Sequence, residues 1–324
     1  MIKRNVIKGE ASMIHDKRKV ALIGTGMVGM SYAYAMLNQN AADELALIDI
    51  NQARAKGEAM DLNHGLAFAE SSMKIYAGGY EDCADADIAV LCAGVAQKAG
   101  ESRTDLLRRN ARVFQSIVGP ALESGFRGIF LVATNPVDIM TRIVRDISGF
   151  ADYRVLGSGT SLDTARLRYL LGEHVGVNPK NVHAYVMGEH GDSEFVPWSQ
   201  AMIAAKRVGD LCAAGVLSMD ELRKISGQVK DSAQVIINAK QATYYGIGMA
   251  LTRITRAIFA NENSILTVSA PLNGEYGERD VYAGAPCIIN RMGIKQIISL
   301  PLDKDEAALM NESCALLRKF YDEL

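Results

Sequence analysis

The chain has 324 residues, of which 49% are hydrophobic and 22% charged, and its formal net charge at pH 7 is −2. This length and apolar content suffice for a large globular core. The mixed charges give no electrostatic reason to expect nucleic acid or an anionic membrane as a partner. The five cysteines never occur as C-x-x-C, which argues against a zinc site or a disulfide framework and favours free thiols in the cytoplasm.

Residues 1–18 form a basic N-terminal extension without the apolar run of a signal peptide. Three interpretations stay open: a frayed tail, an arm on a neighbouring subunit, or sequence upstream of a true start at Met13. No stretch of the chain reaches the ~18 apolar residues of a membrane span. We therefore expect a soluble protein.

The next part of the chain alternates short apolar runs with helical stretches. The runs at 19–24, 44–50, 88–92 and 129–133 predict strands, and 27–39 and 55–68 predict helices. Near-continuous apolarity is typical of parallel strands buried on both faces. We predict an α/β fold whose first half, residues 19–157, is a doubly wound parallel sheet.

The second half, residues 158–324, has a different order of predicted helices, strands and turns. Residues 162–172, 219–240 and 248–261 predict helices, and 182–186 predicts a strand. Short β-rich runs between 264 and 300 are broken by NGEYG, AGAP and RMG, which indicates antiparallel pairs, and 303–324 predicts an amphipathic helix. We expect an α+β catalytic domain.

A G-x-G-x-x-G pattern lies between the first predicted strand and the first predicted helix. In this context its glycines permit a tight turn, close approach of a pyrophosphate and close helix packing. Asp49 ends the second strand, where a carboxylate can bind both ribose hydroxyls and repel a 2′-phosphate. The pattern predicts NAD as cofactor, against the alternative of a plain glycine-rich turn. The residues predicted to bind it are Gly24, Gly26, Met27, Val28, Gly29 and Asp49.

Oxidation of an alcohol requires a base for the hydroxyl proton while the cofactor takes the hydride. Among the histidines, His190 is the best candidate, because flanking Gly188 and Gly191 allow an irregular backbone that can aim an imidazole into a cleft. A buried carboxylate would orient such a base, and we select Asp163. Arg166 lies at i+3 on the same predicted helix and can clamp a substrate carboxylate with two hydrogen bonds. The alternative for Asp163 and Arg166 is a surface ion pair.

The motifs GTGMVG, LIDI, MDLNHG, AGVAQKAGESRTDL, TNPVD, GSGTSLDTARLR, NVHAYVMGEHGDSE and ATYYGI occur in this order from residue 19 onward. Together they resemble the L-lactate dehydrogenases of the lactate/malate dehydrogenase superfamily. The resemblance implies His190 as acid/base, Asp163 as its partner, Arg166 as carboxylate clamp and Arg103 as a mobile-loop cation on the reacting carbonyl. It further implies substrate contacts and cofactor contacts at Gln97, Asn135, Thr243, Ala93, Gly94, Ser158 and Ile247.

Gln97 bears on the choice of substrate. In the superfamily that this chain resembles, malate enzymes have arginine at the loop position that Gln97 occupies here. A neutral Gln97 would leave a second substrate carboxylate unpaired, which favours pyruvate and L-lactate. In the loop that contains Gln97 and Arg103, this chain has Ala99 where many relatives have proline. The resemblance therefore does not extend to the stiffness of this loop. A malate or other L-2-hydroxyacid dehydrogenase, and a non-catalytic NAD-binding protein, remain the alternatives.

Arg168 lies two residues beyond Arg166, about 200° around the helix, so it must face something else. Together with His183 it matches the bacterial lactate dehydrogenases activated by fructose 1,6-bisphosphate. The resemblance implies an allosteric, homotetrameric enzyme of glycolysis and fermentation, in which two subunits present this pair across a symmetry axis. The alternative is a surface arginine and a packed histidine.

Overall fold

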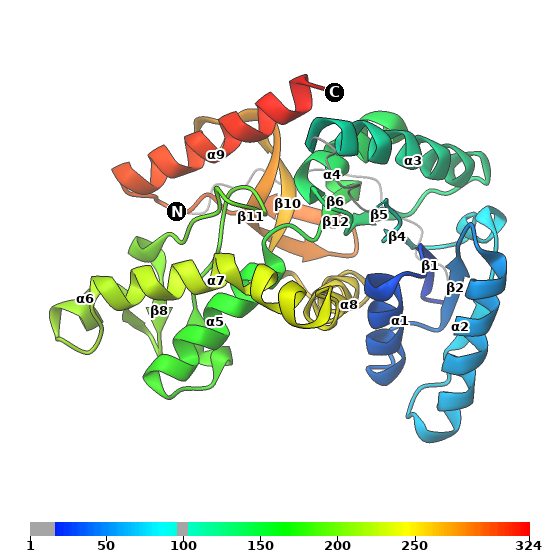
Figure 1. Ribbon diagram of the computed structural model, residues 1–324, viewed down its shortest axis with the longest axis horizontal. Coiled ribbons are helices and arrows are strands. Elements are labelled where there is room, and N and C mark those ends of the chain that lie inside the picture. Colours follow the sequence, from blue (N-terminus) through cyan, green and yellow to red (C-terminus); the bar gives the residue numbers. More distant parts are fainter. Residues whose placement is uncertain (1–16, 96–102) are drawn as a thin grey trace.

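The computed structural model describes residues 17–95 and 103–324, with the backbone alone at 103, 104 and 106. Its main sheet has nine strands in the order β12-β11-β10-β6-β5-β4-β1-β2-β3 (Figure 1). The six strands β1 to β6 are parallel, which confirms the predicted doubly wound sheet. These strands are β1 (Lys19–Ile23), β2 (Glu44–Ile48), β3 (Lys74–Ala77), β4 (Ile88–Leu91), β5 (Ile129–Val132) and β6 (Val155–Gly157).

Helices cover both faces of this parallel sheet (Figure 1). Alternate residues of one strand enter different cores: Val20 and Leu22 pack in the core under α1, whereas Ala21 and Ile23 pack in the core under α3 and α4. Burial on both faces is the reason why the strands are uniformly apolar. The covering helices are α1 (Met27–Asn38), α2 (Gln52–Gly65), α3 (Arg103–Glu123) and α4 (Val137–Ser148).

Strands β10 (Ser264–Asn273), β11 (Arg279–Asn290) and β12 (Gly293–Ile297) pair antiparallel, as predicted. They extend the same sheet, because Ser269 of β10 pairs with Gly157 of β6. A Cβ atom at Gly157 would lie 2.9 Å from the Ser269 Cβ, so glycine is what lets the two strands approach. The sheet is therefore continuous across residue 157, where the sequence predicted a boundary between two domains.

A third core lies beside this sheet, between α5 (Ser161–Val175), α6 (Val208–Ala213) and α7 (Met219–Lys240). It carries the short strands β7 (Val182–His183), β8 (Met202–Ile203) and β9 (Lys206–Arg207). The predicted strand 182–186 is shorter in the structure. The backbone of Val186, at the end of the predicted strand, forms hydrogen bonds to threonine side chains instead of to a neighbouring strand. The Val186 N–H donates to Thr164 Oγ1, and Thr160 Oγ1 donates to the Val186 carbonyl.

Two further helices hold these parts together. Helix α8 (Tyr245–Phe259) packs along α1, and a hydrogen bond of 2.9 Å joins the buried hydroxyls of Tyr32 and Thr255. Helix α9 (Lys304–Asp322) starts at an Asp303–Glu306 capping box and packs on the α3–α4 side. Short 3-10 turns lie at Leu66–Phe68, Tyr80–Cys83, Asp152–Arg154, Pro179–Asn181, Trp198–Gln200 and Glu275–Gly277.

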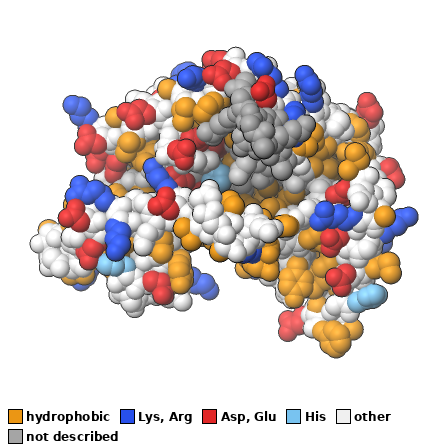
Figure 2. All heavy atoms as spheres, viewed as in Figure 1, with side chains coloured by type: hydrophobic (Ala, Val, Ile, Leu, Met, Phe, Trp, Pro, Cys, Tyr) orange, Lys and Arg blue, Asp and Glu red, His pale blue; other side chains and the backbone are white. Residues whose placement is uncertain are grey.

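Composition led to expectations about surface charge, membrane-spanning helices and cysteines, which can be compared with the structure. Figure 2 shows positive and negative side chains interspersed over the face in view. Among the described residues, no helix is both long and apolar enough to cross a membrane. All five cysteines are free.

Candidate active site

The predicted cofactor residues follow the carboxyl ends of the parallel strands. The glycine loop follows β1, Asp49 follows β2, Gly94 follows β4, and Asn135 and Ser158 follow β5 and β6. Strands β1 and β4 are neighbours at which the chain order reverses. In open α/β sheets the crevice at this switch point is where ligands bind.

The three glycines differ in what surrounds them. Gly24 has φ +103°, and a Cβ there would lie 2.5 Å from the Ala93 nitrogen. A Cβ at Gly29 would lie 2.0 Å from the Gly24 carbonyl oxygen, so helix α1 can approach β1 only with glycine. Within the part of the chain that the structure describes, no neighbouring atom lies within 4 Å of a Cβ at Gly26. The loop thus leaves open space beside the N-terminal amides of α1, which fits a pyrophosphate.

The Asp49 carboxylate anchors this loop. Its Oδ2 accepts hydrogen bonds of 2.8 Å from both the N–H and the hydroxyl of Thr25, and its Oδ1 accepts the Asn51 N–H. Burial alone would raise the pKa of Asp49, but these hydrogen bonds lower it. The ionised group keeps acceptor capacity on Oδ1, which fits a ribose hydroxyl.

The structure brings three of the predicted catalytic residues into direct contact. His190 Nδ1 lies 2.6 Å from Asp163 Oδ2, and Arg166 donates to Asp163 Oδ1 at 2.9 Å. Asp163 is 2% exposed and sits in the first turn of α5. Both carboxylate oxygens are therefore engaged in one buried cluster, in which an imidazole that can carry a proton lies beside a guanidinium that can bind an anion.

Three elements fix the loop that carries His190. The His190 N–H donates to Asp138 Oδ2 of α4 at 2.9 Å, and the Glu189 N–H donates to Ser313 Oγ of α9 at 2.6 Å. Gly188, with φ +89°, pairs with Gly284 of β11. Gly188 thus gives the loop the irregular backbone that the sequence indicated on that side of His190, and the imidazole contacts Asp163 of α5.

Electrostatics favour a charged imidazole in this pocket. Burial by itself disfavours the cation, but the Asp163 carboxylate, assisted by Asp138 and Glu194, raises the pKa of His190 to about 9. Burial likewise opposes ionisation of Asp163, yet His190 and Arg166 hold its pKa below the ordinary value. The imidazole of His190 is therefore protonated at neutral pH.

Sequence reasoning missed two buried acids of this site. Asp138 is 2% exposed, and burial raises its pKa to about 6. Glu194 is 5% exposed and lies in one cluster with Asp163 and His190, whose ligand atoms are all within 4.8 Å of one another. Asp138 is the last residue of the motif TNPVD, and Glu194 is the last residue of MGEHGDSE. The signal in the sequence that could have identified them is a carboxylate within a run that is otherwise apolar or that contains glycines.

The other predicted contacts lie at the start of α1, in or just before α8, or outside the described residues. Thr243 stands between α7 and α8, and Ile247 in α8 packs partly buried on the sheet. Val28 packs on the same core, whereas Met27 is largely exposed. Gln97 and Ala99 lie outside the described residues, as does the side chain of Arg103.

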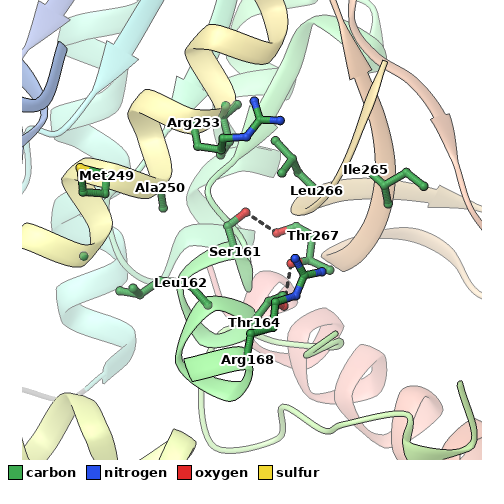
Figure 3. Close-up of a pocket in the computed structure, with 13 residues that line it drawn as sticks. Ser161, Leu162, Thr164, Arg168, Met249, Ala250, Arg253, Ile265, Leu266 and Thr267 are labelled. Carbon is green, nitrogen blue, oxygen red and sulfur yellow. Dashed lines mark hydrogen bonds between the residues drawn. The ribbon is translucent and has the colours of Figure 1, made fainter. Parts of the chain in front are cut away.

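Arg168 faces away from the dyad, as its helical position predicted. Its Nε donates to the carbonyl of Ala184, the neighbour of exposed His183, and burial lowers its pKa. It also lines a separate cavity of about 420 Å³ between α5, α8 and the start of β10 (Figure 3). Arg253 lines the opposite wall, whereas His183 is outside this cavity.

Comparison with known proteins covers nearly the whole chain. Residues 18–157 match the NAD binding domain of the lactate/malate dehydrogenase family, and residues 160–324 match its alpha/beta C-terminal domain. The chain is 54% identical over 301 residues to an L-lactate dehydrogenase of Geobacillus thermodenitrificans, covering 93% of this chain and 95% of the relative. L-lactate dehydrogenase 2 of Bacillus cereus is 51% identical over 302 residues, or 93% and 96% of the two chains.

Solved structures agree with these sequence matches. A lactate dehydrogenase from a Medee basin deep-sea metagenome has a TM-score of 0.93 and 51% identity, covering 94% of this chain and 98% of that one. The ligands-bound form of the minor L-lactate dehydrogenase of Enterococcus mundtii has a TM-score of 0.94 and 45% identity, covering 95% and 98%.

The glycine loop yields a paired test. Gly26→Ala fills the open space beside α1, so it should weaken NADH binding by about tenfold or more while the protein without cofactor keeps its melting temperature. Gly29→Ala should weaken binding and also lower the melting temperature, because its Cβ meets the Gly24 carbonyl oxygen. Fluorescence titration with NADH and thermal unfolding separate the two effects. Wild-type NADH affinity in Gly26→Ala would show that the phosphates lie elsewhere.

Proposed function

This chain belongs to the lactate/malate dehydrogenase family and is an NAD-dependent L-lactate dehydrogenase, and from that premise we propose that His190 is its proton donor and acceptor in the interconversion of pyruvate and (S)-lactate. The observation that carries the proposal is the buried hydrogen bond of 2.6 Å between His190 and Asp163. It occupies Nδ1, so Nε2 is the nitrogen that serves the substrate. NAD, when bound, supplies the hydride chemistry.

The imidazolium protonates the oxygen of the reacting carbonyl, and Asp163 stabilises its charge until then. Arg166 binds the pyruvate carboxylate, since only one of its nitrogens is hydrogen-bonded to Asp163. Because Arg166 and His190 contact the same carboxylate, the anchored end and the reacting end of a small 2-oxo acid are held in fixed relation. Asn135, Thr243 and Arg103 complete the substrate pocket in this proposal, with Arg103 polarising the carbonyl.

The cofactor assignments stand as part of the same proposal. The glycine loop with Met27 and Val28 takes the pyrophosphate, Asp49 the ribose, and Ala93, Gly94, Ser158 and Ile247 the remainder of NAD. We retain 19–157 as the cofactor-binding domain and 158–324 as the catalytic domain, although one sheet runs through both. The five free thiols support a reducing cytoplasm as the site of the reaction.

Regulation forms the last part of the proposal. We assign Arg168 and His183 to a fructose 1,6-bisphosphate site formed between subunits of a homotetramer. Support comes from the hydrogen bond that Arg168 Nε donates to the carbonyl of Ala184, the residue that follows His183 in the chain. A guanidinium can bind a phosphate group with two parallel hydrogen bonds.

His190→Asn should leave NADH binding nearly unchanged and reduce turnover by about 10² or more, because the proton donor is removed. In the wild type, kcat/KM for pyruvate should be constant at neutral pH and fall as pH rises through about 9, because reduction needs the protonated histidine. Steady-state kinetics across pH, with NADH titration as the control, provide the check. Turnover of the variant within tenfold of wild type would remove His190 from the chemistry.

Gln97→Arg should shift preference from pyruvate toward oxaloacetate, because a guanidinium can pair a second carboxylate that glutamine leaves unpaired. The ratio of the two kcat/KM values should change by about 10² or more. Gln97→Lys serves as a comparison that adds charge without a two-bond fork. An unchanged ratio would show that residue 97 does not face the substrate.

Fructose 1,6-bisphosphate should lower the KM for pyruvate, because an activator binds more tightly to the conformation that has the higher affinity for pyruvate. Arg168→Ala and His183→Ala should each raise the half-activating concentration, because each variant loses one group of the proposed phosphate site. The measurement is the KM for pyruvate at increasing effector concentration for all three proteins. Absence of activation in the wild type, or wild-type responses from both variants, would exclude the site.

A further inference from the structure

Residues 93–95, which follow β4, include two of the positions that we assign to the cofactor. The pairing of β4 with β5 continues one step beyond the strands, where the Ala133 N–H donates to the Leu91 carbonyl at 3.0 Å. After that point, the segment is held by two side chains, Thr134 from the turn after β5 and Asn110 from α3. Its position therefore depends on other elements as well as on the sheet.

Thr134 and Asn110 hold the two ends of this short segment. The Thr134 hydroxyl donates to the Ala93 carbonyl at 2.6 Å, and the Val95 N–H donates to Asn110 Oδ1 at 2.9 Å. Asn110 is 2% exposed, so its side chain acts on a ligand only through the backbone that it holds. Gly94 lies between the two hydrogen bonds and is exposed. The two side chains thus fix an exposed glycine from both sides.

The surroundings of Gly94 show how closely these side chains enclose it. A Cβ atom there would lie 2.7 Å from Thr134 Cγ2 and 3.4 Å from Asn110 Oδ1. Glycine is what permits this close approach. A methyl group at residue 94 would point at the two side chains, so it would press on the contacts that hold the segment.

We propose that Thr134 and Asn110 are positioning residues for the cofactor: their hydrogen bonds to residues 93–95 set the place of Gly94 in the crevice before NADH binds. This proposal rests on the cofactor contacts assigned above to Ala93 and Gly94. A segment that is already ordered raises affinity, because the ligand does not have to order it. Without either bond, the free segment samples other positions and NADH binds more weakly, whereas turnover at saturating NADH changes less.

Thr134→Val and Thr134→Ser separate the hydroxyl group from the shape of the side chain. Valine has the shape of threonine without the hydroxyl, so the Kd of NADH should rise by about fivefold to tenfold, as expected for one lost hydrogen bond. Serine keeps the hydroxyl and should stay within about twofold of wild type. Fluorescence titration with NADH provides the measurement. Unchanged NADH affinity in Thr134→Val, whether or not its melting temperature falls, would overturn the proposal.

Gly94→Ala tests the same contact from the other side. Its methyl group would meet Thr134 Cγ2, so NADH binding should weaken by about tenfold. Thr134→Ser removes Cγ2 and keeps the hydroxyl, so the double variant should regain most of the affinity. Gly57→Ala is the control, because among the described residues no neighbouring atom lies within 4 Å of a Cβ at Gly57 in α2. Equal losses in the single and double variants would count against the proposed contact.

Asn110→Ala should also weaken NADH binding. Combined with Thr134→Val, it should lower the affinity by less than the product of the two single effects, because both bonds hold one segment. Full multiplication of the two effects would overturn their joint role. Wild-type NADH affinity in Gly26→Ala would instead refute the cofactor site on which the proposal rests.

Discussion

The hydrogen bond between His190 and Asp163 joins two parts of the chain that fold as separate elements, a glycine-flanked loop and the first turn of α5. It is short and its carboxylate is almost wholly buried, so its strength depends on both backbones being held in place. Contacts from α4, β11 and α9 supply that rigidity. Elements from both halves of the chain thus hold the loop that carries this imidazole.

Burial acts in the same direction on the three acids around this bond, but the net pKa shifts differ because their partners differ. It works against the charged form of every carboxyl group, but Asp163 has His190 and Arg166 as partners and stays ionised. Asp138 has one backbone N–H, and burial moves its pKa to about 6. Glu194 faces the same cations from farther away, and its pKa rises to about 8. Differences in partners, at similar burial, give three carboxyl groups three proton affinities.

The cofactor crevice and the dyad are connected by the continuous sheet. The loops that we assign to the cofactor follow the carboxyl ends of β1, β2, β4, β5 and β6, and β6 is also the strand that pairs with β10. Gly157 makes that junction possible because any side chain would collide with Ser269. The two functional regions therefore share one rigid layer, which suits a reaction in which cofactor and acid must meet one small substrate.

The sequence by itself determined the parallel sheet, the glycine loop and the helices α1, α2, α5, α7, α8 and α9, because these depend on local periodicity and turn chemistry. It also singled out His190, Asp163 and Arg166 as candidate catalytic residues, which the structure brings into contact. It did not reveal the single sheet through residue 157, the shortened strand after Val182, or the buried acids Asp138 and Glu194. Those features arise from contacts between residues distant in the chain. The sequence alone does not show whether an acidic side chain will be exposed to water or buried beside a histidine. This depends on contacts that only the tertiary structure forms.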